Sequence, residues 1–243
     1  MKDIYGLLGR NIGYSFSKGY FTEKFEKESL NCEYNNFDLI DISELKEIIE
    51  NPSVKGLNVT IPYKEEVVSY LDKLDPIAKE IGAVNVIKFE KNQKLTGYNS
   101  DYYGFTESLT PLLNPKIKKA LILGTGGASK AIAFALDRLD ISHTFVSRNP
   151  DFNELSYKDL DEDIIKSYKL IVNCTPLGTH PNVDDCPDIP YEHITENHVL
   201  YDLIYNPAQT SFMKKGLQQG AKASNGLQML ILQAEKSWEI WNK

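Results

Sequence analysis

Lys64 and Asp101 are the residues of this sequence whose types are best suited to proton transfer. Lys64 follows a predicted buried strand in the stretch NVTIPYKEEV and is predicted to open a helix. A cation is disfavoured there because the N-terminal end of a helix dipole is positive. The ammonium is therefore either a solvated surface charge or a group held in place for use. An amine beside a carboxylate can accept a proton from a reacting group or donate one to it.

Other polar residues follow strands in the same half of the chain. GYNSD places Asn99 and Asp101 at a strand-to-helix junction, and IGAVN places Asn85 at a strand edge. Ser15 and Ser17, in YSFS, have one residue between them, so both can project to the same side. Open α/β sheets bind ligands at the carboxyl ends of their strands. These side chains are therefore predicted to face one ligand, with helix capping as the alternative for the serines and Asp101.

A glycine-rich turn, LILGTGGASKA, lies between an apolar strand and a helix. Gly124 allows a tight turn, and Gly126 removes side-chain bulk where a pyrophosphate would approach. Gly127 and Ala128 keep the helix start close to the strand, with N–H groups aimed at an anion. The third fingerprint position is Ser129 instead of Gly or Ala. The strand–turn–helix context favours dinucleotide binding over a purely structural turn.

The strand after this turn favours NADP over NAD. An NAD site usually has Asp or Glu about 20 residues after the loop, where it holds the ribose 2′-hydroxyl. FVSRN offers Ser147 and Arg148 instead, with no acid at the strand end. A guanidinium matches a phosphate in charge and geometry. Arg148 is therefore predicted to hold the 2′-phosphate of NADP, and a solvated arginine is the alternative.

Alternating strands and helices must position these residues. In the first half, strands are predicted over 4–9, 33–40 and 55–60, a hairpin turning at Lys91–Asn92 over 83–99, and helices over 17–30, 43–50 (with Ser43 as N-cap), 64–74 and 101–113. In the second half, strands are predicted over 118–124, 142–149, 168–176, 198–207 and 221–225, and helices over 128–139, 209–220 and 226–241.

Two rounds of alternating strands and helices predict an α/β protein with two lobes and a cleft between them. Residues 1–100 are expected to form a substrate-binding catalytic domain, and residues 101–225 a Rossmann-type dinucleotide-binding domain. The C-terminal helix, 226–243, is apolar almost all round at its start and is expected to pack back on the first domain.

Composition bounds the remaining possibilities. The net charge of −7 over 243 residues argues against a general affinity for nucleic acid or anionic membranes. No apolar run approaches the roughly 18–20 residues needed to span a bilayer, and MKDIYGLLGR does not resemble a signal peptide. Cys32, Cys174 and Cys186 are odd in number and lack metal-site spacing. We expect a cytoplasmic protein with reduced thiols and no metal.

Nine motifs in order make the chain resemble the shikimate dehydrogenase family over nearly its whole length. They are YSFS, NVTIPYK, GAVN, GYNSDYYG, GTGGA, VSRN, NCTPLG, DLIYNP and NGLQMLILQA. Singly these motifs are modest, and together they are highly specific. The resemblance implies a reversible, NADP-dependent oxidoreductase that interconverts shikimate and 3-dehydroshikimate in aromatic amino-acid (chorismate) biosynthesis.

The resemblance also implies a role for each matching residue. Lys64 would be the proton acceptor or donor, and Asp101 the acid paired with it. The implied substrate contacts are Ser15 and Ser17 to the carboxylate, Thr60 and Asn85 to ring hydroxyls, and Tyr205 and Gln233 from the second lobe and the last helix. The implied cofactor contacts are Gly124, Thr125, Gly126, Gly127 and Ala128 to the pyrophosphate, Ser147 and Arg148 at the 2′-phosphate, Thr175, and Leu203, Gly226 and Met229 at the nicotinamide.

The chain departs from the family pattern at several positions. A His commonly precedes the first serine, where this chain has Tyr14, and a Pro commonly follows the second, where it has Lys18. NSD replaces the usual NTD and keeps the hydroxyl. SRN replaces the usual NRT, and no second basic residue follows closely. That last departure weakens the expectation of NADP more than the expectation of the reaction.

Two other functions stay open at this point. One is a quinate/shikimate dehydrogenase that prefers NAD and uses the same catalytic pair. The other is a non-catalytic NADPH-binding sensor, which would have no reason to keep Lys64 and Asp101. In each case the partner is a small molecule rather than nucleic acid or a membrane, and the chain is a monomer or a homodimer.

Overall fold

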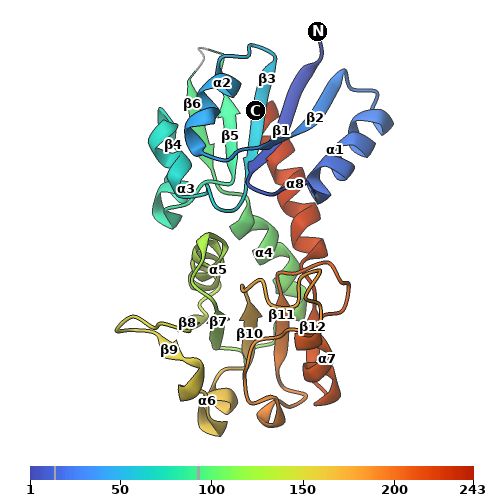
Figure 1. Cartoon of the computed structure of the whole chain (residues 1–243). Coiled ribbons are helices and arrows are strands. Elements are labelled where there is room, and N and C mark those ends of the chain that lie inside the picture. Colours follow the sequence, from blue (N-terminus) through green and yellow to red (C-terminus); the bar gives the residue numbers. More distant parts are fainter. Residues whose placement is uncertain (14, 92–93) are drawn as a thin grey trace. The chain divides into compact units, whose positions relative to one another are not determined.

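The computed structural model describes residues 1–13, 15–91 and 94–243 (Figure 1). Its internal contacts divide the chain into two compact units. Unit 1 contains residues 1–100 and 234–243, and unit 2 contains residues 101–233. Within the described residues, each unit is built on a six-stranded sheet.

The sheet of unit 1 is mixed. Its strands are β1 (Asp3–Gly9), β2 (Cys32–Asp38), β3 (Val54–Val59), β4 (Lys73–Leu74), β5 (Val86–Phe89) and β6 (Leu95–Tyr98), in the order β2-β1-β3-β5-β6-β4. β1 pairs in parallel with both β2 and β3, whereas β5 is antiparallel to β3 and β6. The predicted hairpin is thus confirmed as β5 and β6, and residues 92 and 93 of its turn lie outside the described residues.

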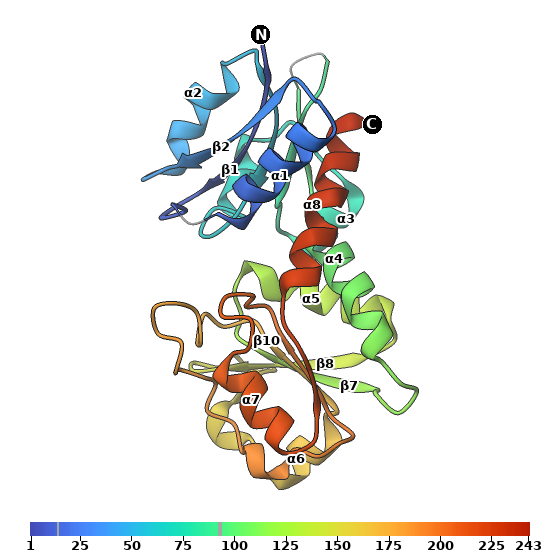
Figure 2. The ribbon, with the colours of Figure 1, turned by 90° about the vertical axis from the view of Figure 1, so that its right-hand side faces the viewer.

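Helices cover both faces of this sheet. They are α1 (Phe16–Lys27), α2 (Leu45–Ile49), α3 (Pro76–Ile81) and the end of α8 (Leu227–Asn242), with 3-10 helices η1 (Ile42–Glu44) and η2 (Glu66–Tyr70). On one face α1 and the end of α8 lie side by side (Figures 1 and 2). Phe21 and Phe25 of α1 contact Trp238 of α8 in an aromatic cluster. On the other face α2 packs Leu45 and Ile48 into a separate core.

The predicted helix over 64–74 is wrong. This segment forms turns, the short η2, and then β4, which pairs with β6. In an α-helix the Lys64 carbonyl would accept the N–H of Val68, but it accepts the Val84 N–H at 2.8 Å, and Val68 donates to Glu65 instead. Hydrogen bonds between this segment and the neighbouring strand region therefore override the helical spacing of its apolar residues.

Two other local predictions need correction. The cap before η1 is Asp41, not Ser43: the Asp41 carboxylate accepts the N–H of Ser43 at 2.8 Å. The helix α3 was missed because it has only six residues. Its signals are present, with Asp75 as N-cap, a proline at the first helical position and Gly82 in the left-handed conformation at its end.

The sheet of unit 2 is parallel throughout. Its strands are β7 (Lys119–Leu123), β8 (Ser142–Ser147), β9 (Leu155–Ser156), β10 (Leu170–Asn173), β11 (Val199–Asp202) and β12 (Lys222–Ser224). The order β12-β11-β10-β7-β8-β9 reverses direction between β7 and β10. This is the doubly wound order, in which ligands bind beyond the carboxyl ends of the strands at the reversal point. The predicted α/β class is confirmed.

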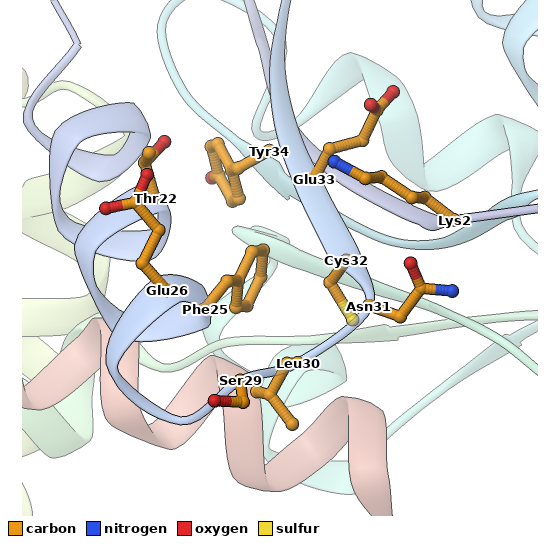
Figure 3. Close-up of a pocket in the computed structure, with 10 residues that line it drawn as sticks. All are labelled: Lys2, Thr22, Phe25, Glu26, Ser29, Leu30, Asn31, Cys32, Glu33 and Tyr34. Atoms are coloured by element: carbon orange, nitrogen blue, oxygen red, sulfur yellow. The ribbon is translucent and has the colours of Figure 1, made fainter.

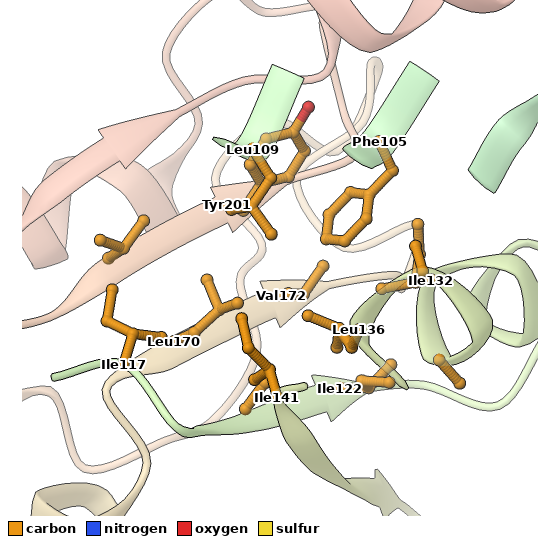
Figure 4. Packing of buried hydrophobic residues seen from close by; sticks show 14 of the residues in the cluster. Phe105, Leu109, Ile117, Ile122, Ile132, Leu136, Ile141, Leu170, Val172 and Tyr201 are labelled. Atoms are coloured by element: carbon orange, nitrogen blue, oxygen red, sulfur yellow. The ribbon is translucent and has the colours of Figure 1, made fainter. Parts of the chain in front are cut away.

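Both faces of this sheet are buried, which is why its strands read as continuous apolar runs. Along β7, Ile122 faces a core formed with α4 (Asp101–Leu109), α5 (Gly127–Arg138) and the start of α8, which Figure 4 shows. Leu121 faces the opposite core, formed with α6 (Glu162–Ser167) and α7 (Ser211–Gln218). Figure 2 shows these two helices. Short 3-10 helices are η3 (Thr110–Leu112), η4 (Tyr157–Asp159) and η5 (Tyr191–His193).

Candidate active site

The residues predicted to bind substrate in unit 1 lie in segments next to one end of its sheet. The parallel strands β1 and β3 end at Gly9 and Val59. Asn85 precedes β5, and it lies at the same end because β5 runs antiparallel to β3: the Val59 N–H donates to the Asn85 carbonyl at 2.8 Å. Asn85 is therefore at the amino end of its strand, whereas we expected each junction at a carboxyl end. The antiparallel pairing still brings it to the same edge.

Ser15 is the N-cap of α1, as the capping alternative predicted. Its Oγ accepts the N–H of Lys18 at 3.2 Å. A hydroxyl that accepts one hydrogen bond can still donate its own hydrogen, so capping is compatible with a contact to a carboxylate. Ser17 lies inside the first turn of α1. The departure at Tyr14 lies outside the described residues.

Lys64 lies in a loop that is anchored on both sides. The Thr60 N–H donates to the Leu8 carbonyl of β1 at 2.9 Å, and the Lys64 carbonyl accepts the Val84 N–H. The Lys64 side chain is partly buried. Because no α-helix starts here, the unfavourable helix-dipole position that made this lysine conspicuous does not exist. Its location is set instead by the end of β3 and the segment before β5.

Asp101 is the first residue of α4 and is only 2% exposed. An acid is favoured at that end of a helix. The two residues before it are fixed in unit 1: the Asn99 amide donates to the Ala83 carbonyl at 3.0 Å, and the Ser100 N–H donates to the Asn85 side chain at 2.6 Å. Asp101 belongs to unit 2 and Lys64 to unit 1, and their action as a pair stays a prediction.

The glycine loop of unit 2 forms a tight turn that is open at the start of α5. Gly124 has φ +99°, a conformation in which other residues are strained. Gly126 is the N-cap residue of α5 and makes no side-chain cap hydrogen bond, and a Cβ added there would meet no atom within 4 Å. Ser129 fits the third fingerprint position because its hydroxyl turns back to the Gly126 carbonyl at 2.7 Å. The helix start therefore faces open space, and Thr125, Gly127 and Ala128 line the same turn.

Arg148 directly follows β8, the neighbour of β7 in the sheet. Its side chain is exposed, as a group that holds a phosphate must be before binding. Ser147 shapes this strand end, since its hydroxyl accepts the Asn149 N–H at 3.2 Å. Burial raises the pKa of the Tyr157 phenol, and the positive charge of Arg148 opposes that rise.

Thr175 follows β10 and Leu203 follows β11, whereas Gly226 follows β12 and Met229 lies in α8. The Asn173 side-chain oxygen accepts both the N–H and the hydroxyl of Thr175, at 3.0 and 2.7 Å. The Leu203 N–H donates to the Asn173 carbonyl at 3.0 Å. Residue 226 has to be glycine, because a Cβ there would lie 2.1 Å from the Leu203 carbonyl oxygen. Met229, by contrast, is 5% exposed and packs in the core of unit 2.

Tyr205 and Gln233 complete the predicted set. Tyr205 comes after the end of β11, and Gln233 lies in α8, and both side chains are partly buried. Within unit 2, α8 passes close to α4, where a Cβ on Gly104 would lie 2.6 Å from the Met229 carbonyl oxygen. The binding roles of Tyr205 and Gln233 stay predictions.

Asp202 is a residue that the sequence analysis missed. It ends β11 with no exposed surface, and it accepts hydrogen bonds from the Asn173 amide at 3.0 Å, the Ile204 N–H at 3.1 Å and the Thr210 hydroxyl at 2.6 Å. Burial raises its pKa to about 6, and the three hydrogen bonds oppose that rise. A charged residue at the end of the buried run VLYD was the signal that could have found it.

A surface hollow of about 490 Å³ in unit 1 is separate from these residues (Figure 3). Lys2, Asn31 and Cys32 line it, and they mark the amino ends of the parallel strands β1 and β2. The residues predicted to bind the substrate lie next to the opposite end of the sheet. Among the described residues, no three His, Cys, Asp or Glu side chains group in a way that could hold a metal ion. No helix in the described part of the chain has the length and apolar character of a membrane span.

A parallel sheet in the doubly wound order, with a glycine-rich turn after its first strand, defines unit 2 as a Rossmann-like domain. A family model described as the shikimate dehydrogenase substrate binding domain matches residues 7–87. The chain is 38% identical to "Shikimate dehydrogenase (NADP(+))" of Methanococcus maripaludis, over 98% of this chain and 90% of that protein. The chain belongs to the shikimate dehydrogenase family, which confirms the resemblance.

Solved structures agree. A chorismate mutase/shikimate 5-dehydrogenase fusion protein from Clostridium acetobutylicum superposes with a TM-score of 0.87 at 37% identity, covering 100% of this chain and 91% of that one. A shikimate 5-dehydrogenase from Thermus thermophilus, in complex with NADP(H) and shikimate, superposes with a TM-score of 0.86 at 29% identity, covering 99% and 93%.

Proposed function

We propose that this chain is an enzyme that catalyses the reversible NADP-dependent reduction of 3-dehydroshikimate to shikimate, a step of aromatic amino-acid biosynthesis. Family membership supports this reaction, and so do the NADP(+) in the name of the Methanococcus relative and the two ligands of the Thermus structure. The observation that carries the proposal is that Thr60, Lys64 and Asn85 lie in the segments at one end of the unit 1 sheet, in a chain of this family. Ser15 caps the helix that follows β1.

The substrate residues have complementary tasks. The hydroxyls of Ser15 and Ser17 donate to the substrate carboxylate, and Thr60 and Asn85 bind ring hydroxyls. Serine hydroxyls bind the carboxylate as neutral, shape-selective donors, whereas an arginine would bind it more strongly. Because the hydroxyl proton must leave as the ring carbon is oxidised, Lys64 accepts that proton in the oxidising direction and returns it in the reducing direction.

Unit 2 contributes the cofactor residues. The open helix start behind Gly126 suits a pyrophosphate, and the exposed Arg148 suits a 2′-phosphate. When bound, NADP supplies or accepts the hydride. Thr175 and Leu203 follow the strands next to the reversal point, where the nicotinamide end would lie. The three free cysteines support a reducing compartment, the cytoplasm.

Initial rates with shikimate and with quinate, each with NAD⁺ and NADP⁺, test the proposed function. We expect the highest kcat/KM for shikimate with NADP⁺. A higher value for quinate with NAD⁺ would assign the chain to the rival dehydrogenase instead. Absence of turnover in all four reactions, with NADPH still bound in a fluorescence titration, would assign it to the sensor.

The variant Arg148→Gln tests the cofactor preference within the same assay. Loss of a charged contact to phosphate should raise KM for NADP⁺ by about tenfold or more and leave KM for NAD⁺ unchanged. Arg138→Gln is the matched control, because Arg138 ends α5 and lies over the Phe134 ring. An equal rise in KM for both cofactors would show that Arg148 does not bind the 2′-phosphate.

A further inference from the structure

A chain of buried hydrogen bonds runs through unit 1 behind the predicted substrate residues. The Tyr34 hydroxyl donates to the Asn58 side-chain oxygen at 2.8 Å, and the Asn58 amide donates to the Ser237 hydroxyl at 2.9 Å. The hydroxyls of Ser237 and Ser100 lie 3.2 Å apart. None of these four residues, which we call the buried polar chain, is more than 9% exposed. They come from β2, β3, α8 and the segment before α4.

One end of the buried polar chain holds Asn85. The Asn85 side-chain oxygen accepts the Ser100 N–H at 2.6 Å, and its amide nitrogen donates to the Ser100 hydroxyl at 3.1 Å. Asn58 also donates to the Asn85 carbonyl at 3.3 Å. Because both the oxygen and the nitrogen of the Asn85 amide have defined partners, its orientation is fixed. Ser100 in turn precedes Asp101 in the sequence.

The other end is Tyr34. Burial raises the pKa of the Tyr34 phenol, so the hydroxyl keeps the hydrogen that it donates to Asn58. The Tyr34 ring is itself locked in place, since it stacks on Phe21 with ring centroids 4.7 Å apart at an angle of 9°. A hydroxyl on a rigid, buried ring is a fixed partner for Asn58.

Removal of one residue's polar group should disturb the hydrogen bonds along the whole buried polar chain. A buried donor or acceptor that loses its partner is costly, so its neighbours shift to find another. In a low-dielectric interior such networks are also cooperative. Removing the Ser237 hydroxyl takes an acceptor from Asn58 and a partner from Ser100 at the same time.

We propose that Tyr34 and Ser237 are positioning residues for substrate binding: through the buried polar chain, they hold the Asn85 amide in the orientation that binds the substrate. The inference rests on the proposed function and adds to it two residues that do not themselves contact the ligand. It also gives the last helix, through Ser237, a part in shaping the substrate end of unit 1.

Two variants test the proposal. Tyr34→Phe keeps the buried ring and removes its hydroxyl, and Ser237→Ala removes one hydroxyl from a helix that tolerates alanine. In each we expect KM for shikimate to rise about tenfold, with KM for NADP⁺ unchanged and kcat reduced by less than about threefold. The split between the two KM values distinguishes positioning from a general loss of structure.

Unit 2 offers matched controls. Ser108 and Tyr201 form a buried hydroxyl pair at 2.6 Å in its core, so Ser108→Ala and Tyr201→Phe make the same two deletions elsewhere. These variants should lose similar stability in thermal denaturation and keep the wild-type KM for shikimate.

Two results would overturn the inference. One is an active wild-type chain in which Tyr34→Phe and Ser237→Ala raise KM for shikimate no more than the controls do. The other is an equal rise in KM for shikimate and for NADP⁺. Either would refute the positioning role and leave the proposed function intact, whereas a wild-type chain without turnover would refute both.

Discussion

At Gly126, the effect of a substitution on stability can be separated from its effect on cofactor binding. Its φ of −78° is available to any residue, and a Cβ there would meet no protein atom within 4 Å. Gly126→Ala should therefore cost at most about 1 kcal/mol of stability, because alanine caps a helix less well than glycine. If a pyrophosphate approaches the helix start, the added methyl must intrude on it, and Kd for NADPH should rise about tenfold or more.

Fluorescence titration with NADPH and thermal denaturation measure the two effects of Gly126→Ala. Gly19→Ala is the control, since it also adds a methyl in open space, in α1 of unit 1. Wild-type NADPH affinity in Gly126→Ala would show that the pyrophosphate does not lie against this helix start.

Asp202 makes stability depend on pH. Its pKa is about 6 in the folded chain, above its ordinary value of 3.8. Between about pH 4 and pH 6 the folded chain therefore binds more protons than the unfolded chain, and the free energy of unfolding falls as pH rises. The contribution of this group across the window is about 3 kcal/mol. Asp202→Asn, which cannot titrate, should show a flatter dependence.

Urea denaturation of the wild type and of Asp202→Asn at several pH values checks this prediction. The difference between their free energies of unfolding should change steadily from about pH 4 to pH 6 and level off above. A constant difference over this range would mean that the Asp202 carboxyl titrates alike in the folded and unfolded chains.

At the scale of elements, the contact between β3 and the end of α8 depends on a glycine. A Cβ on Gly56 would lie 2.3 Å from the Trp241 ring, whose indole N–H donates to the Ile87 carbonyl at 3.0 Å. Gly56→Ala must displace the ring or the strand, which should destabilise the chain by about 1–3 kcal/mol.

The helix α1 offers the opposite substitution as a control. Gly19 is exposed inside this helix, with no atom near its missing Cβ, so Gly19→Ala should stabilise by about 0.5–1 kcal/mol. Urea denaturation measures both variants. Equal stabilities for Gly56→Ala and the wild type would mean that α8 does not pack against β3 in this way.

Sequence patterns predicted most of the long elements because burial and periodicity agree in them. The apolar run of β7, the helix α5 after it and the long α8 are all where the spacing placed them. The segment 64–74 failed because its helical spacing competes with hydrogen bonds to residues that follow it in the chain, Val84 and Leu95. Such non-local partners are not visible in a local pattern.

The candidate site was predicted through the family motifs more than through local structure. Lys64 was singled out for a helix-end position that it does not occupy, and the motif makes it a candidate independently of that position. Tyr34, Asp202 and Ser237 were not found, because a buried polar group is recognised by its partners. Those partners, such as Asn58 for Ser237, can be 179 residues away in sequence.

At the scale of the whole molecule, the two units divide the predicted chemistry between them. Unit 1 carries the serines, Thr60, Lys64 and Asn85, and unit 2 carries Asp101, the glycine loop and Arg148. The proposed reaction needs residues from both, and its proton transfer depends on Lys64. A substitution of Lys64 therefore tests the proposed reaction as a whole.

The most direct test is the steady-state kinetics of Lys64→Ala with shikimate and NADP⁺, beside Lys73→Ala, which removes an exposed lysine from the same segment. A group that moves a proton in the transition state contributes about 10²–10⁴-fold to the rate. We predict that kcat falls by this amount in Lys64→Ala, with KM changed only a few-fold, and that Lys73→Ala keeps the wild-type values. An unchanged kcat with a raised KM in Lys64→Ala would contradict the account, because it would make Lys64 a binding residue only.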